Sequence, residues 1–143
     1  MADVAESGPF AGWRALAPQL FAILRIVAAL VFIQFGTMKL FAFPVGMPPN
    51  NAAAPLMSQM GLAGVLETFG GFLILIGLFT RPVAFILAGE MAVAYFQGHF
   101  PKSFWPVVNL GTPAILYCFY YLYLSTAGPG IWSVDSARRR ASS

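Results

Sequence analysis

Three ionisable side chains, Arg25, Glu67 and Glu90, lie inside long apolar stretches of the chain. A charge at membrane depth is costly, so such residues usually face a partner, a cavity or a functional path. At about 1.5 Å of helix rise per residue, Arg25 and Glu90 both lie roughly 13 Å from the same membrane face. The matching depth predicts a structural ion pair between Arg25 and Glu90, and it leaves open whether the pair has a further role.

Glu67 lies deeper, about 21 Å from the flank marked by Arg81. It shares a helical face with Gly64, Gly70 and Gly71, and small residues mark the places where membrane helices pack closely. We therefore expect Glu67 to point into a helix bundle. A buried carboxyl can hold and exchange a proton near neutral pH, so Glu67 is the candidate catalytic, proton-active residue.

Further polar side chains gather toward the same outer half of the predicted bundle. Counting places Tyr95 at the depth of Glu67, and Lys39 nearer the outer interface, where its ammonium group can reach water. A carboxyl beside histidine, tyrosine and lysine suits proton exchange or the binding of a quinone headgroup. The alternative is a polar network that only joins the helices. The predicted ligand-binding residues are Lys39, Glu67, Tyr95, His99 and Asn109.

Histidine and cysteine are too rare for most metal chemistry, because the chain has one of each, His99 and Cys118. A haem held by two histidines of one chain is excluded, and so is a cluster of histidine and cysteine ligands. Cys118 has no partner for a disulfide within the chain. No metal site is predicted, and a quinone is the one candidate cofactor.

The composition indicates a membrane protein. Hydrophobic residues make up 59% of the chain, charged residues 9%, and the mean hydropathy is +0.75. Soluble domains carry about 25% charged residues, so this apolar surface is expected to face the lipid bilayer. Three of the eight basic residues form the run Arg138–Arg140, which favours an anchor beside anionic lipid over nucleic-acid binding.

Four apolar stretches are long enough, or nearly so, to cross a bilayer, which takes about 20 residues. Prolines and glycines bound them, and the range 44–59, with four prolines, is expected to be a loop,. The predicted fold is an all-α bundle of four transmembrane helices. The predicted spans are Leu20–Phe41, Met60–Phe79, Val83–Gln97 and Val107–Ser125.

Orientation follows from the positive-inside rule. Arg14, Arg81 and Arg138–Arg140 flank one side of the four spans, whereas Lys39 and Lys102 lie on the other. Both termini are therefore expected in the cytoplasm.

The predicted organisation has three parts. Residues 1–17 form a short polar N-terminal segment, residues 18–135 the four-helix membrane domain, and residues 136–143 a basic cytoplasmic tail.

Several motifs, in this order over about residues 20–135, resemble the DoxX family of small four-helix membrane proteins of bacteria and archaea. The resemblance implies a location in the cytoplasmic (inner) membrane. Family members have been linked to membrane oxidoreductases, including a thiosulfate:quinone oxidoreductase subunit, and to redox-stress complexes. The chain departs from the family pattern at Thr112, where an acid is common. The matching residues are Arg25, Gly36-Thr-Met-Lys39, Glu67-Thr-Phe-Gly-Gly71, Gly77-Leu-Phe-Thr-Arg-Pro82, Met91–Tyr95, His99–Pro106, Asn109 and Ala127–Gly130.

The leading hypothesis is an integral membrane component of a redox system that holds a quinone or another small amphiphile among its helices. One alternative is a non-catalytic assembly or stabilising subunit of a larger membrane complex, and a further alternative is a small-solute carrier. Other membrane or membrane-associated proteins are the expected partners. The first hypothesis predicts a pocket lined by polar groups, the second fully paired charges, and the third a water-filled path. Whether the chain is an enzyme stays open.

Overall fold

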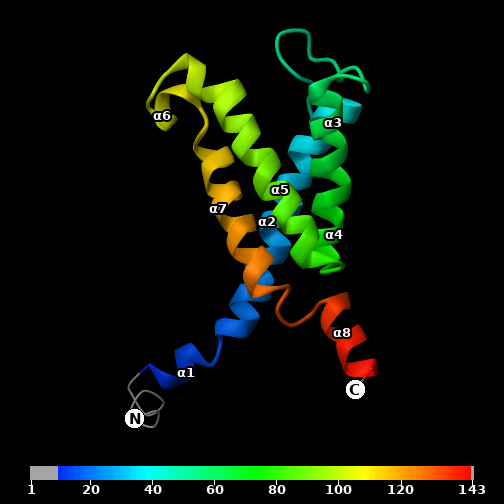
Figure 1. Ribbon diagram of the computed structural model, residues 1–143, viewed down its shortest axis with the longest axis vertical. Helices are drawn as coiled ribbons and strands as arrows, with labels where there is room; N and C mark the ends of the chain where they lie inside the picture. Colours follow the sequence, from blue (N-terminus) through cyan, green and yellow to red (C-terminus); the bar gives the residue numbers. More distant parts are fainter. Residues whose placement is uncertain (1–9, 143) are drawn as a thin grey trace.

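The computed structural model describes residues 10–142, and this part of the chain is helical, with an isolated bridge between Met47 and Ala52 but no β-strand. Figure 1 shows the helices in their order along the chain. The elements are α1 (Ala11–Arg14), α2 (Ala17–Phe41), α3 (Gln59–Val65), η1 (Leu66–Gly70), α4 (Gly71–Ile76), α5 (Thr80–Ala94), η2 (Tyr95–His99), η3 (Phe100–Lys102), α6 (Pro106–Asn109), α7 (Thr112–Ala127) and α8 (Val134–Ala141).

Three continuous helical segments of the described chain are long and apolar enough to cross a membrane. They are α2, the segment α3–η1–α4 over Gln59–Ile76, and the segment α5–η2–η3 over Thr80–Lys102. Their lengths of 25, 18 and 23 residues match the roughly 20 residues that a bilayer requires. The all-helical fold and its first three apolar helices are therefore as predicted.

The fourth predicted helix, Val107–Ser125, is wrong in its first part. Leu110 has a left-handed backbone conformation, with φ 60°, which ends α6 after four residues. A new helix, α7, then begins at Thr112 with Pro113 in its first turn, where the missing N–H of proline costs no hydrogen bond. α7 has 16 residues, fewer than the predicted span.

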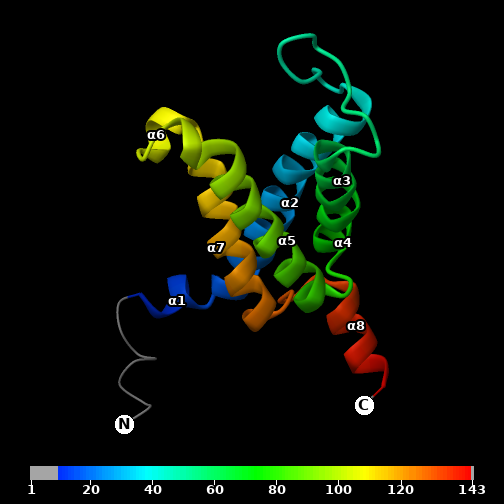
Figure 2. The same cartoon turned by 45° about the horizontal axis from the view of Figure 1, so that its top comes forward.

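The helices pack as two pairs around a shared core. α2 lies along α3–η1–α4, and α5 lies along α7, as Figure 2 shows from a second direction. A Cβ added to Gly36 on α2 would collide with Thr68 on η1, so only glycine permits the first pair to approach this closely. The buried apolar side chains between the pairs include Ala29, Phe32, Ile74, Leu87, Tyr121 and Leu124.

The C-terminal basic residues belong to a helix, α8, which lies at the end of the molecule where α4 ends and α5 begins (Figure 1). The side chain of Ser133 accepts a hydrogen bond from the N–H of Ser136 and caps α8. The carboxylate of Asp135 accepts hydrogen bonds from the backbone N–H groups of Phe79, at 3.0 Å, and Thr80, at 2.9 Å. These bonds fix α8 to the first turn of α5.

Candidate functional site

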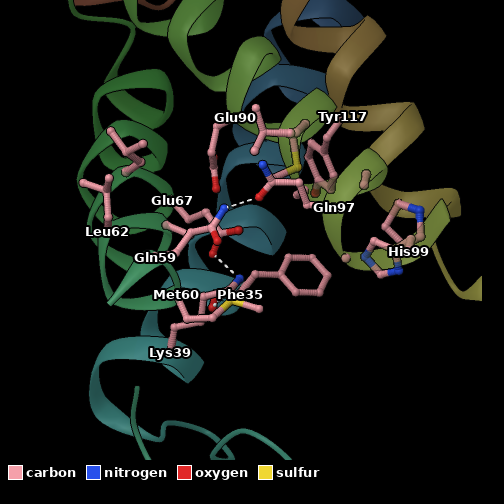
Figure 3. A pocket seen from close by; sticks show the side chains of 18 of the residues that line it. Phe35, Lys39, Gln59, Met60, Leu62, Glu67, Glu90, Gln97, His99 and Tyr117 are labelled. Atoms are coloured by element: carbon pink, nitrogen blue, oxygen red, sulfur yellow. Dashed lines mark hydrogen bonds and ion pairs between the residues drawn. The ribbon is translucent and has the colours of Figure 1, made fainter. Parts of the chain in front are cut away.

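A cavity of about 720 Å³ lies between the two helix pairs, with walls from α2, α3, η1, α5, η2 and α7. Figure 3 shows the polar side chains that project into it. Leu62 and Ile86 lie on its wall and are 59% and 54% exposed, so the cavity reaches the surface between α3 and α5. The other lining residues are Phe32, Phe35, Met38, Lys39, Gln59, Met60, Ala63, Leu66, Glu67, Gly89, Glu90, Met91, Val93, Ala94, Gln97, Gly98, His99, Lys102, Leu110, Pro113, Ala114 and Tyr117.

Two π-helical turns interrupt the long helices at the wall of this cavity. η1 carries Glu67, and η2 carries Gln97 and His99. A π-turn adds a residue to the helical turn and changes the direction in which nearby side chains point, and such turns are frequent at functional sites. The two interruptions therefore aim polar groups from separate helices into one space.

Lys39 and Glu67 form a buried ion pair across the α2–η1 interface. The Lys39 Nζ and Glu67 Oε2 atoms are 2.5 Å apart, and the two side chains are 11% and 4% exposed. Lys39 was predicted to reach toward water at the outer interface, and this prediction is wrong because its stem turns back to Glu67. Removal from water strengthens the attraction between the charges, which offsets part of their desolvation cost.

Glu90 lies on α5, facing the same cavity. Both of its carboxyl oxygens are buried without a hydrogen-bond partner among residues 10–142. The Glu90 carboxyl lies near that of Glu67, close enough for the two to share a proton, and it also interacts electrostatically with Lys39. Figure 3 shows the three side chains directed into one region. Two carboxyl groups therefore lie near one ammonium group, which is bonded to Glu67.

The predicted Arg25–Glu90 ion pair is wrong. Arg25 is fully buried, and its guanidinium group donates to four backbone carbonyl oxygens. The acceptors are Pro129 at 2.9 Å, Ile74 and Leu75 at 2.6 Å each, and Trp132 at 2.7 Å. Carbonyl groups at the C-terminus of a helix carry partial negative charge, so the end of α4 and the loop after α7 satisfy the cation without a carboxylate.

His99 is on the cavity wall, and Asn109 braces the loop behind it. The Nδ1 atom of His99 is 2.9 Å from the carbonyl oxygen of Asn109, which can only accept, so Nδ1 carries the proton in this bond. The Asn109 side chain donates to the carbonyl of Ser103 at 2.8 Å and accepts from the N–H of Gly111 at 2.7 Å. These bonds use the amide for the loop and keep it out of the cavity.

Tyr95 also lies away from the cavity wall. Its ring contacts those of Phe96 and Phe100, with centroids 5.4 and 6.2 Å apart. Of the five residues predicted to bind a ligand, the structure brings Lys39, Glu67 and His99 to one cavity and leaves Tyr95 and Asn109 outside it.

The polar residues of the cavity that were absent from the predicted ligand set are Gln59, Glu90, Gln97, Lys102 and Tyr117. The side-chain N–H of Gln59, at the start of α3, donates to the amide oxygen of Gln97 on η2 and bridges the two walls (Figure 3). Glu90, Ala94 and Gln97 follow one another at spacings of four and three, which is one face of a helix. That spacing was the available signal for this wall.

A comparison with protein families identifies the chain. The DoxX family model matches residues 20–100. The chain belongs to the DoxX family. No solved structure matches it.

Three relatives of this DoxX chain follow, and two of them are named as membrane proteins. A protein of Haemophilus influenzae without an assigned function is 42% identical over 124 residues, which cover 83% of this chain and 90% of the relative. Inner membrane protein YphA of Escherichia coli is 29% identical, over 82% of this chain and 89% of its own. A membrane protein of Mycobacterium tuberculosis, Rv3486, is 27% identical over 78% and 77% of the two chains.

The DoxX cavity combines an apolar interior with a concentrated set of polar groups. The Lys39–Glu67 pair is neutral as a unit, whereas an ionised Glu90 would add an uncompensated charge, which an apolar site disfavours. With a proton on its carboxyl, Glu90 is both a hydrogen-bond donor and an acceptor. The arrangement can therefore hold one polar headgroup beside Glu90 and an apolar body along the helices.

Proposed function

We propose that this DoxX-family chain binds a small amphiphile of the quinone class in the cavity, as an integral membrane component of a redox system. The volume of about 720 Å³ is within the roughly 300–1,000 Å³ of typical small-molecule sites. The exposed wall residues Leu62 and Ile86 provide a route for an apolar ligand between α3 and α5.

The observation that carries this proposal is the buried carboxyl of Glu90, whose oxygens accept a hydrogen bond from no donor among residues 10–142 and whose polar neighbour is a second carboxyl, that of Glu67. A buried polar group without a partner loses several kcal/mol of hydrogen-bonding energy unless a ligand or water satisfies it. A protonated Glu90 donates to a carbonyl oxygen, and a quinone offers one at the end of an apolar molecule. The alternative of an assembly subunit predicted fully paired charges, so Glu90 favours a ligand.

Glu67 takes part in this proposal through its ion pair with Lys39. The pair holds a fixed charge arrangement beside Glu90, and Glu90 and Glu67 together form the proton-active end of the cavity. Electrons for a redox reaction come from another membrane or membrane-associated protein, which is the proposed partner of the chain.

The ligand is tested by filling the cavity. Gly89 lines the cavity and an added Cβ there meets no atom within 4 Å, so we expect Gly89→Leu to be tolerated and to occupy ligand space. Gly12 on α1 is equally open and lies outside the cavity, so Gly12→Leu is the matched control. After gentle purification we expect quinone with the wild type and with Gly12→Leu, but not with Gly89→Leu. A wild-type protein that neither retains a quinone nor binds an added short-chain quinone would contradict the proposal.

The role of Glu90 is tested with two substitutions in the same titration. Glu90→Leu removes the donor and should weaken binding of the short-chain quinone roughly tenfold. Glu90→Gln retains an N–H donor of similar shape, so its affinity should stay within about threefold of wild type. Equal affinities for all three proteins would remove Glu90 from the site.

We also propose that α7 is a fourth span and that both termini lie in the cytoplasm of a bacterial or archaeal cell, beside its inner membrane. Sixteen residues reach about 24 Å, and α6 with its following turn adds length at the outer end. Arg81 and Arg138–Arg140 gather at the end of the molecule where α7 ends (Figure 1), as the positive-inside rule requires of a cytoplasmic face.

Orientation is tested by labelling single cysteines in a Cys118→Ser background. Asn50 and Ala137 are both exposed and lie at opposite ends of the chain's long helices. We expect an impermeant thiol reagent to label Asn50→Cys on intact cells, and to label Ala137→Cys only after lysis. The reverse pattern would invert the proposed topology.

A further inference from the structure

A second cavity, of about 480 Å³, lies at the opposite end of the molecule, between the first turn of α5 and the helix α8. Arg81 borders it from α5, and Arg138 and Arg139 border it from the last turns of α8. Three guanidinium groups around one hollow form a strongly basic site, which is separate from the cavity of the Lys39–Glu67 pair.

The acidic residue of this site offsets only part of its positive charge. Asp135 also lines the hollow and attracts Arg139, and its carboxylate accepts hydrogen bonds from the N–H groups of Phe79 and Thr80, so one negative charge faces three guanidinium groups. Arg81 is held in place because its Nη1 donates to the carbonyl oxygens of Ser125 and Thr126.

Arg138 and Arg139 remain available to a ligand. Within residues 10–142 neither guanidinium group donates a hydrogen bond to the protein, although Arg138 lies over the ring of Phe79 at 5.5 Å. Thr80, a fully buried residue, also lies on the wall of this hollow, and its side chain interacts with the carboxylate of Asp135. Two guanidinium groups that donate no hydrogen bond to the described residues thus border one space.

We infer that this hollow binds the phosphate group of an anionic phospholipid. Guanidinium groups form charge-assisted, often bidentate hydrogen bonds with phosphate oxygens. Phe79 and Trp132, near this end, are 53% and 58% exposed, and aromatic side chains at a helix end favour the membrane interface. The acyl chains of a lipid can lie along these apolar side chains while its phosphate enters the hollow, which a free phosphate ion cannot do.

The test compares lipids by their effect on the thermal stability of the whole chain in detergent. Phosphatidylglycerol should raise the melting temperature and be retained in native mass spectra, whereas phosphatidylcholine should have a much smaller effect. The double variant R138Q/R139Q should weaken phosphatidylglycerol binding roughly tenfold or more. Both arginines are exposed, so the variant is expected to fold.

A charge-matched control separates a site from general attraction to a charged surface. R14Q/R140Q removes the same charge, and neither residue borders the hollow, so phosphatidylglycerol binding should stay within about threefold of wild type. Equal weakening by both double variants would overturn the proposal. Inorganic phosphate that matches the stabilisation by phosphatidylglycerol would also overturn it, because the occupant would then be a free anion.

Discussion

Arg25 and Glu90 are both buried ionisable groups in apolar helices, yet the protein treats them in opposite ways. Arg25 donates to four carbonyl oxygens from the end of α4 and from the loop between α7 and α8. The carboxyl oxygens of Glu90 accept from no donor within residues 10–142, and the side chain faces a cavity. The first arrangement joins three parts of the fold, and the second leaves a group unsatisfied where a ligand fits.

The comparison shows that a buried charge indicates function only after its partners are counted. Backbone carbonyl oxygens at a helix end can satisfy an arginine completely, since guanidinium carries five donors and needs no carboxylate. Glu90 has no such backbone donors within reach, because the N–H groups of a helix interior are already bonded. The satisfied charge of Arg25 is therefore structural, and the unsatisfied carboxyl of Glu90 marks the candidate quinone site.

The comparison is tested most strongly at Arg25. Arg25→Met removes the guanidinium donors from four carbonyl oxygens, of which that of Ile74 keeps the N–H of Gly77, so we expect a loss of about 3–5 kcal/mol in the free energy of unfolding. Thermal unfolding in detergent measures this loss. The expected effect on quinone binding is small, provided that the folded fraction is isolated.

A double variant distinguishes this account from an Arg25–Glu90 pair. If the two residues do not interact, Arg25→Met with Glu90→Gln should lose stability additively, within about 0.5 kcal/mol. A clear recovery in the double variant would mean that Glu90 partners Arg25 after all, and the contrast between the two ends would fail.

The cavity end is tested with a double-mutant cycle on Lys39 and Glu67. Lys39→Met leaves a buried carboxylate beside a second carboxyl group, so the single variant should lose more stability than the pair Lys39→Met with Glu67→Leu. We expect a coupling energy of about 1–3 kcal/mol between the two positions. Chemical or thermal unfolding of the four proteins in detergent gives this value.

Lys102 supplies the matched lysine for that cycle. It also lines the cavity but takes no part in the Lys39–Glu67 ion pair. Lys102→Met combined with Glu67→Leu should be additive within about 0.5 kcal/mol. A coupling energy between Lys102 and Glu67 as large as that between Lys39 and Glu67 would indicate that Glu67 responds to any positive charge in the cavity, and not to a specific ion pair with Lys39.

The membrane class, the helical fold and the family follow from the sequence because they depend on composition, long apolar periods and motif order. The helix break at Leu110 does not, since a non-glycine residue with positive φ has no strong local signal. A proline such as Pro113 can lie inside a kinked helix or in the first turn of a new one, and the structure has it in the first turn of α7, which packs on α5.

The site was predicted in part, and the errors have one cause. Counting residues along a helix gives an approximate depth for a side chain. It does not give the direction in which the side chain points around the helix axis, nor the effect of a π-turn on that direction. Glu67 and Lys39 were placed at different depths, yet the long lysine stem closes the gap to 2.5 Å. Arg25 and Glu90 were placed at the same depth, yet Arg25 bonds to carbonyl oxygens at the end of α4 and in the loop after α7, whereas Glu90 faces the cavity with Glu67.

The smallest expected effect concerns Asp135, which joins α8 to α5 near the Arg25 end. Burial alone raises the pKa of Asp135, but hydrogen bonds from the backbone N–H groups of Thr80 and Phe79 outweigh it, so its pKa lies below the ordinary 3.8. A lowered carboxyl pKa stabilises the fold above the unfolded-state pKa, and this stabilisation is lost as the pH falls through the folded-state value.

Asp135→Asn should therefore lose about 1 kcal/mol of unfolding free energy near neutral pH, as expected for a weakened helix cap. The deficit should begin to shrink as the pH falls below the ordinary pKa of 3.8, where the carboxyl of the unfolded chain takes up a proton, and it should disappear once the pH has passed the lower folded-state pKa,. Melting curves at about pH 6 and about pH 3 measure the two differences. A deficit that is the same at both pH values would mean that the charge of Asp135 contributes nothing, and that only its shape holds α8 against α5. In that case Asp135 would act only as a spacer between α8 and the first turn of α5. Of the two charged side chains, Arg25 alone would then contribute its charge to the stability of this end of the molecule.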